Sequence, residues 1–319
     1  MTSVNGGSRI SVVAATCDRP ERLSRMLDAL ERQTVGADFE VIVVDDASDG
    51  ATAVLLAQRA HEVKRFRLTA LRQDVRRGPA AARNLGWRAA KAPLIAFTDD
   101  DCEPDPGWLQ ALLDADRGDA VLQGRTEANP AEHDAGGPFS RSLEVHDLGP
   151  WYPTCNMAFP RAVLERLGGF DEGYPLPGGE DTDLAWRALE VGVAPALVPD
   201  AVVYHAVTDL GPLGKLRLAT RWAPAFQIFR RHPGLRSHLT WGVFWKRSHA
   251  LLLLALLGVA LGRRFPPAVL LAAPYARDVR ARMSAEGASP AVAPYYAVHD
   301  AVETATAATG SLRHGTLVL

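Results

Sequence analysis

The chain has 319 residues, of which 47% are hydrophobic and 23% are charged, and its formal net charge at pH 7 is -2. This length accommodates one large α/β domain and a smaller appendage, and the composition is that of a globular protein rather than a disordered one. The nearly balanced charge argues against a protein that binds nucleic acid through electrostatic attraction.

Cysteine usage and the first residues bear on the compartment. Cys17, Cys102 and Cys155 show no paired Cys/His spacing, which argues against structural zinc, and an odd count favours a reducing compartment. Residues 1–8 are polar and predict a disordered start without a secretory signal. We therefore expect a cytoplasmic protein.

Apolar spacing predicts alternating strands and helices through the first 100 residues. The expected strands are 9–15, 39–44, 66–71 and 94–98, and the expected helices begin at Pro20, around residue 51 and at Gly78-Pro79. Because the strands are continuous apolar runs, both faces of their sheet should be covered. The pattern predicts an α/β fold of Rossmann-like type, with a mainly parallel sheet and flanking helices.

The second half of the expected domain begins with a long polar stretch, 125–151, which we interpret as a loop. A strand at 155–159, a helix at 161–167, a helix opening at Glu180 and a strand delivering His205 follow. We expect one domain over 9–230, with a nucleotide-binding half (9–124) and an acceptor and catalytic half (125–230).

The remaining residues, 231–319, predict a helical, partly apolar appendage. Residues 250–262 are apolar without interruption, and a second apolar run follows Pro266-Pro267. Each run has roughly 12 residues, short of the ~20 that a spanning helix needs. A soluble core helix and an interfacial hairpin both remain open, but the basic and aromatic flanks favour contact of residues 241–276 with a membrane surface, peripherally on the inner face of the cell membrane.

Acidic residues follow two of the buried strands. Asp99-Asp100-Asp101 repel one another unless a cation or many N–H donors neutralise them, and an Asp-x-Asp pair suits Mg²⁺ or Mn²⁺ bridging a diphosphate. The alternative is a solvated acidic turn. Asp45-Asp46 repeats the pattern, and ligands bind beyond the carboxyl ends of such strands.

Three further features are chemically suggestive. Arg76, Arg77 and Arg83 surround a helix start that suits phosphate oxygens; a solvated basic helix is the commoner explanation for any single arginine, and Arg83, followed by Asn84, is the preferred functional candidate. Glu180-Asp181 provides carboxylates for a general base, with helix capping as the competing role. His205 is either a core histidine or a third metal ligand.

The ordered set of motifs resembles the inverting glycosyltransferases of GT-A fold in family 2. The segments that carry the resemblance are 12–23, 39–49, 78–86, 97–101, 156–159, 168–172 and 179–187. They span roughly residues 9–207. The resemblance implies a transferase that moves a sugar from a nucleotide diphosphate, most commonly UDP, to an acceptor hydroxyl of a glycan, a lipid-linked glycan or a small molecule.

The resemblance also implies site residues. The expected nucleotide-binding residues are Thr16, Asp18, Arg19, Asp46, Arg77, Gly78, Arg83, Asp99 and Asp100. Asp101, Asp99 and His205 are expected to bind the metal, and Asp181, with Glu180, to supply the catalytic base. Residues expected to line the donor sugar and acceptor are Asn156, Gly169, Phe170 and Asp171.

Two departures and two alternatives complete the expectation. Cys102-Glu103 follows the Asp-x-Asp motif where many members have more acid, and the chain lacks the Gln/Arg-x-x-Arg-Trp pattern of processive synthases, which favours single sugar addition. A sugar nucleotidyltransferase would need glycines in the first turn, 16–20, which has none. A non-catalytic carbohydrate-binding scaffold would not need the acidic residues and His205.

Overall fold

The computed structural model describes residues 8–174 and 176–319. The described chain forms two compact units: unit 1 comprises residues up to Glu132 and Ser142–Ala206, and unit 2 comprises His133–Arg141 and Val207–Leu319. Of the expected disordered start, residues 1–7 lie outside the described part. The functional division expected at residue 230 stays a prediction.

Unit 1 is built on an eight-stranded sheet with the order β3-β2-β1-β4-β8-β6-β9-β5. The strands are β1 (Ile10–Thr16), β2 (Phe39–Asp45), β3 (Arg67–Arg72), β4 (Leu94–Asp99), β5 (Cys102–Pro104), β6 (Ala120–Ala128), β8 (Asn156–Pro160) and β9 (Ala194–His205). β1 pairs in parallel with β2 and β4, whereas β8 runs antiparallel to β4 and β6. The expected fold class is confirmed.

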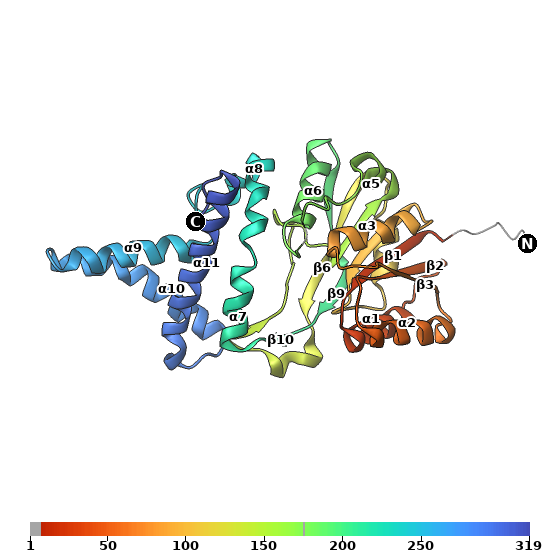
Figure 1. Ribbon diagram of the computed structural model, residues 1–319, viewed down its shortest axis with the longest axis horizontal. Helices are drawn as coiled ribbons and strands as arrows, with labels where there is room; N and C mark the ends of the chain where they lie inside the picture. The colour runs from red at the N-terminus through yellow and green to blue at the C-terminus, as the bar shows by residue number, and fades with distance from the viewer. Residues whose placement is uncertain (1–7, 175) are drawn as a thin grey trace, which may run out of the picture. The chain divides into compact units, whose positions relative to one another are not determined.

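Helices cover both faces of this sheet (Figure 1). They are α1 (Pro20–Glu31), α2 (Gly50–Glu62), α3 (Pro79–Ala89), α4 (Trp108–Ala115), α5 (Arg161–Leu167) and α6 (Glu180–Glu190). Alternate strand residues enter two separate cores: Val12 and Val41 pack with α1 and α4, and Val13 and Ile42 pack with α3, α5 and α6. Burial on both faces explains why these strands are continuously apolar.

The expected loop at 125–151 is partly wrong, because β6 continues to Ala128 and the 3₁₀ helix η1 (Pro130–Ala135) follows. The strand was hidden because its buried positions include polar residues that are hydrogen-bonded inside the sheet. Gln123 donates to the carbonyl of Asn156, and a Cβ at Gly124 would lie 2.3 Å from the Asn156 amide. Helix α4, which the sequence pattern did not reveal, was also missed.

Unit 2 is helical apart from a short ribbon of β7 (Ser140–Arg141) and β10 (Thr208–Asp209). Its α-helices are α7 (Gly211–Thr220), α8 (Ile228–Arg231), α9 (Arg247–Gly262), α10 (Ala273–Ala285) and α11 (Ala293–His314). The 3₁₀ helices are η2 (Ala223–Gln227), η3 (Pro233–His238), η4 (Pro266–Ala272) and η5 (Pro290–Val292). Within residues 8–174 and 176–319, no helix combines the length and the apolar character needed to cross a bilayer.

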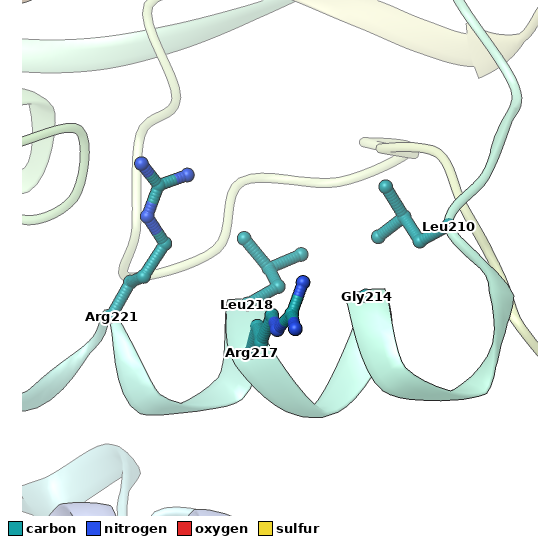
Figure 2. A pocket seen from close by; sticks show the side chains of 5 residues that line it. All are labelled: Leu210, Gly214, Arg217, Leu218 and Arg221. Carbon is teal, nitrogen blue, oxygen red and sulfur yellow. The ribbon is translucent and has the colours of Figure 1, made fainter.

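An apolar core joins α9, α10 and α11 in unit 2, with Leu252, Tyr275 and Tyr296 among its members. One side of α7 lines an open hollow of about 460 Å³ (Figure 2). Its lining residues are Leu210, Gly214, Arg217, Leu218 and Arg221. They recur at helical spacing, so two arginines and two leucines share one face of the helix.

Candidate active site

The carboxyl ends of β1, β2 and β4 bring the two acidic clusters to one edge of the sheet. In the parallel ladders Thr16 lies opposite Asp45, and Ala15 lies opposite Asp99. The backbone N–H of Asp46 also donates to the carbonyl of Thr16, at 2.9 Å. The predicted neighbourhood of the acidic strand ends is therefore present in unit 1.

Asp46 fixes the beginning of α3. Its Oδ1 accepts hydrogen bonds from the backbone N–H of Arg77 (2.8 Å) and from the Gln73 amide (3.1 Å), and its Oδ2 accepts from the N–H of Gly78 (2.9 Å). Gly78 has φ of 87°, a conformation that favours glycine, and Pro79 then starts the helix. The carboxylate is thus engaged by the protein itself, and its contact with a nucleotide stays a prediction.

Asp18 ties together the loops that follow β1 and β2. Its backbone N–H donates to the Ser48 hydroxyl at 2.9 Å, and its Oδ1 accepts from the N–H of Asp49 at 2.7 Å. Its other oxygen forms an ion pair with Arg76. Asp18 has a φ of 54°, and about a third of its side chain is exposed. Its carboxylate is therefore held in place by these contacts and stays accessible to solvent at the rim of the site.

The three consecutive aspartates divide into one inward and two outward side chains. Asp100 is buried and accepts a hydrogen bond from the Thr16 hydroxyl at 2.7 Å, and Arg19 lies 3.2 Å from it. Burial raises the pKa of Asp100 to about 7, against the opposing charge of Arg19. Asp99 and Asp101 are the partly exposed members, which is the geometry that an Asp-x-Asp pair requires.

Arg83 joins three acidic side chains from two distant segments. Its Nη2 donates to Asp99 Oδ1 at 2.7 Å, and its Nη1 donates to Glu180 Oε1 at 3.1 Å and to Asp181 Oδ1 at 3.2 Å. Only 6% of the Arg83 side chain is exposed. Burial by itself raises the pKa of Asp99, but the charge and hydrogen bond of Arg83 hold that pKa below its usual value.

Glu180 and Asp181 differ in exposure. Glu180 is 2% exposed and Asp181 has 21% of its side chain exposed. Burial, and then the neighbouring Asp181 charge, raise the pKa of Glu180 above its usual value. Asp181 Oδ2 accepts from the backbone N–H of Thr154 at 3.0 Å, so it is oriented from both sides and faces the more open region.

His205 and Asp101 form the pair with metal-ligand chemistry. The Nδ1 of His205 lies 2.9 Å from the Ala206 carbonyl, so Nδ1 carries the proton and Nε2 presents a lone pair, 3.7 Å from Asp101 Oδ1. Cys102 lies in the same cluster, but burial raises the pKa of its thiol well above the usual value. A carboxylate and a neutral imidazole fit a divalent cation.

The residues expected near the sugar and acceptor have mainly internal partners. Asn156 is 0% exposed, and its amide bonds Trp108, Arg125 and Ala201. The carbonyl and N–H of Phe170 both bond the Asn84 amide, at 2.9 Å each. These contacts build the fold around the site, and a sugar contact at these positions stays a prediction.

The turn at 168–172 depends on a close approach to α3. Gly169 has φ of 80°, and a Cβ there would lie 2.3 Å from Asn84 Oδ1. Asp171 Oδ1 caps the N–H of Gly173 at 2.7 Å. Sequence reasoning missed Asn84 as an anchor, although its place beside Arg83 and the Gly168-Gly169 pair were available as signals.

Together, an α/β sheet of this order and a cluster of carboxylates at its edge define a glycosyltransferase domain of GT-A fold. The chain belongs to glycosyl transferase family 2, whose sequence model matches residues 11–166.

Known relatives agree with this assignment. The chain is 29% identical over 274 residues to validoxylamine A glucosyltransferase of Streptomyces hygroscopicus subsp. jinggangensis, a match covering 73% of this chain and 63% of that protein. It is 30% identical over 213 residues to pre-mycofactocin glycosyltransferase of Mycobacterium tuberculosis, covering 61% of this chain and 42% of that protein. The chain thus spans less than two thirds of these relatives.

Solved structures share the fold. The mannosyltransferase PcManGT from Pyrobaculum calidifontis, in complex with GDP-Man and Mn²⁺, aligns with a TM-score of 0.61 at 24% identity, covering 96% of this chain and 88% of that one. TarS 1–349 of S. aureus, in complex with UDP-GlcNAc, aligns with a TM-score of 0.51 at 16% identity, covering 97% and 92%.

Proposed function

We propose that this protein transfers a sugar from a nucleoside diphosphate to an acceptor hydroxyl, by direct displacement with inversion at the anomeric carbon and with a divalent cation. The observation that carries the proposal is the Arg83 bridge. One buried guanidinium joins Asp99, one of the expected metal ligands, to Asp181, the expected base, at 2.7 and 3.2 Å. The groups proposed to act on the donor and on the acceptor are therefore held by the same side chain.

Asp101, Asp99 and His205 are the proposed metal ligands. Mg²⁺ or Mn²⁺ held there supplies positive charge for the diphosphate leaving group. The tautomer of His205 supports this assignment, since its Nε2 lone pair is directed to the side of Asp101. Arg19 pairs through Nη1 with Asp100 at 3.2 Å and with Asp101 at 3.0 Å, and 54% of its side chain is exposed; we propose that its other N–H groups contact phosphate oxygens from the same side.

The nucleotide is proposed to occupy the rim beside Thr16, Asp18 and Asp46. Asp18 supplies an exposed carboxylate for a ribose hydroxyl or base N–H, and Asp46 holds the α3 start in place for phosphate. Arg77 and Gly78 lie at that start. We propose UDP-sugar as the donor, following the resemblance.

Asp181 is the proposed general base. Proton removal from the acceptor hydroxyl accompanies C–O bond formation, so a carboxylate is a sufficient base. Its partial exposure and the two hydrogen bonds that orient it favour Asp181 over the buried Glu180. The acceptor is proposed to approach past the turn that carries Phe170 and Asp171.

Residues 241–276 are proposed to bring the enzyme peripherally to the inner face of the cell membrane, where a lipid-linked glycan would serve as acceptor. The supporting observation is the apolar surface on α9 and η4. A small soluble acceptor would not need this surface.

A nucleotide screen tests the proposal. Thermal denaturation of the full chain is followed with UDP, GDP and dTDP, each with and without Mn²⁺, because a ligand that binds only the native state raises its stability. We expect a Mn²⁺-dependent stabilisation by one nucleotide, and release of that nucleotide from its sugar donor. Binding without any cleavage of the donor would support the carbohydrate-binding scaffold instead.

A further inference from the structure

The two halves of α9 have different surroundings. In its first half, Leu251 and Leu252 are 6% exposed and pack with α10 and α11. Seven of the apolar side chains that follow are between 46% and 74% exposed, namely Leu256, Leu257, Val259, Leu261, Phe265, Val269 and Leu270. We name residues 256–272, the second half of α9 with the turn and η4, the hairpin tip. It contains the end of α9 that projects away from α7 and α11 (Figure 1).

Within the hairpin tip, α9 and η4 pack closely against each other. A Cβ at Gly258 would lie 2.6 Å from the Ala268 carbonyl, and one at Gly262 would lie 2.6 Å from a methyl group of Val269. These glycines therefore let η4 pack directly on α9. The hairpin is held together by its own backbone contacts while its large apolar side chains point to solvent, and contiguous exposed apolar surface marks an interaction site.

The positive charge around the hairpin tip favours one kind of partner. Arg263 and Arg264 are exposed in the turn of the hairpin tip, and the sequence has no Asp or Glu from 247 to 277. Unit 2 as a whole has 15 Lys and Arg against 6 Asp and Glu, whereas unit 1 has 20 against 31. Basic residues beside apolar ones favour an anionic lipid surface. They disfavour a second copy of the same tip, because its arginines would repel.

We propose that the hairpin tip inserts its apolar side chains into the interface of an anionic bilayer, with Arg263 and Arg264 at the lipid phosphates. α9 has 16 residues, and no described helix is able to span a bilayer, so the element lies in the interface. Within the expected segment 241–276, Trp245 packs on Phe226 with ring centroids 5.2 Å apart, so Trp245 belongs to the unit's own packing, whereas Trp241 is 72% exposed.

This inference rests on the proposed function for its purpose, and its test is independent of it. The full chain is mixed with vesicles of pure phosphatidylcholine or of phosphatidylcholine with phosphatidylglycerol, and the bound fraction is measured by flotation. We expect binding to the anionic vesicles, weakened by salt. The double variant Phe265→Ser, Leu270→Ser should lower the partition coefficient at least about tenfold, because two large apolar side chains leave the interface. Arg263→Gln, Arg264→Gln should lower it about tenfold or more.

The matched control is Leu312→Ser, which replaces an 86% exposed leucine of α11 in the same unit outside the hairpin tip. It should bind vesicles as the unaltered chain does. Equal binding by the tip variants, or no binding to anionic vesicles by the unaltered chain, overturns the inference. The inference is also overturned if the unaltered chain is oligomeric and binds no vesicles while the tip variants are monomeric. That result would identify the hairpin tip as a self-association surface. Nucleotide-dependent thermal stabilisation, measured in parallel without lipid, reports separately on the proposed function.

Discussion

Arg83 and Asp181 lie 3.2 Å apart, guanidinium to carboxylate, although 98 residues separate them in the sequence. The same guanidinium reaches Asp99 and Glu180. Breaking a buried ion pair leaves uncompensated charge, which costs about 3–5 kcal/mol. We therefore expect Arg83→Met to lower the free energy of unfolding by about that amount. It should also raise the pKa of Asp99, because the main group that lowers this pKa is removed.

Urea unfolding of both proteins measures the change in free energy. Arg88→Met is the control, because Arg88 lies on the same helix with half of its side chain exposed. If Arg83→Met lowered the free energy of unfolding no more than the control does, the ion pairs of Arg83 would not contribute to stability as we expect.

The variant Asp181→Asn tests whether Asp181 is the general base. Loss of a general base lowers the rate by roughly 10²–10⁴. The amide keeps the size of the side chain, so donor affinity should be unchanged while turnover falls by that factor. Steady-state rates and nucleotide titration separate the two effects. Glu190→Gln, an exposed acid at the other end of α6, should keep full turnover. Normal turnover by Asp181→Asn would show that another group takes the proton.

The proposed metal ligands are tested by binding rather than by turnover. His205→Gln and Asp101→Ala should each weaken Mn²⁺-dependent nucleotide binding by at least about tenfold, since even partners of metal ligands have effects of that size. Isothermal titration at several Mn²⁺ concentrations measures this. His146→Gln, at an exposed histidine of unit 1, is the control. Nucleotide binding that is independent of Mn²⁺ in all four proteins would rule out the assignment.

Two adjacent glycines provide a matched pair for the turn beside α3. Gly168 and Gly169 have φ of 75° and 80°, so an added Cβ strains both. Only at Gly169 does the Cβ also meet other atoms, at 2.3 Å from Asn84 Oδ1. Gly168→Ala should cost about 1 kcal/mol and Gly169→Ala clearly more, about 2–4 kcal/mol. Thermal or urea unfolding gives the difference, and equal losses would show that the Asn84 contact adjusts without cost.

The stability of unit 2 should depend on pH through the ionisation of Glu303. Although burial raises its pKa, the hydrogen bond of His249 and the charge of Lys246 lower that pKa to about 2, from 4.5 in the unfolded chain. A lowered carboxyl pKa stabilises the fold above pH 4.5, and the contribution disappears as the pH falls toward 2. At pH 7 it amounts to about 3 kcal/mol.

Glu303→Gln should therefore lower the free energy of unfolding at pH 7 by about this amount, and the two proteins should converge as the pH approaches 2. Asp209→Asn, at an exposed carboxylate of the same unit, should leave the pH dependence unchanged. A constant difference between Glu303→Gln and the unaltered chain from pH 7 to pH 3 would show that the ion pair is not the cause.

The sequence permitted prediction of the sheet and its acidic edge because both follow from local patterns. Continuous apolar runs such as 39–44 reveal strands buried on both faces, and parallel strands end at the same edge. Strand β6 was only visible with the structure, since Gln123 and Thr126 are polar residues buried through hydrogen bonds and sulfur contacts. The contacts of Arg83 with Asp181 and of Asn84 with Phe170 were equally inaccessible, because they depend on how α3 packs against segments more than 80 residues away.

Helix α3 serves as a common support for parts of the site that are far apart in the chain. Asp46 holds its first turn, Arg83 holds Asp99 and Asp181, and Asn84 holds the backbone of Phe170. A Cβ at Gly86 would lie 2.5 Å from a methyl group of Val13, so the helix is pressed directly on β1. Any shift of this helix would move the proposed diphosphate side, the proposed general base Asp181 and the turn at 168–172 together. Mutations on its sheet-facing surface would thus impair binding and turnover at once, without touching either reactant.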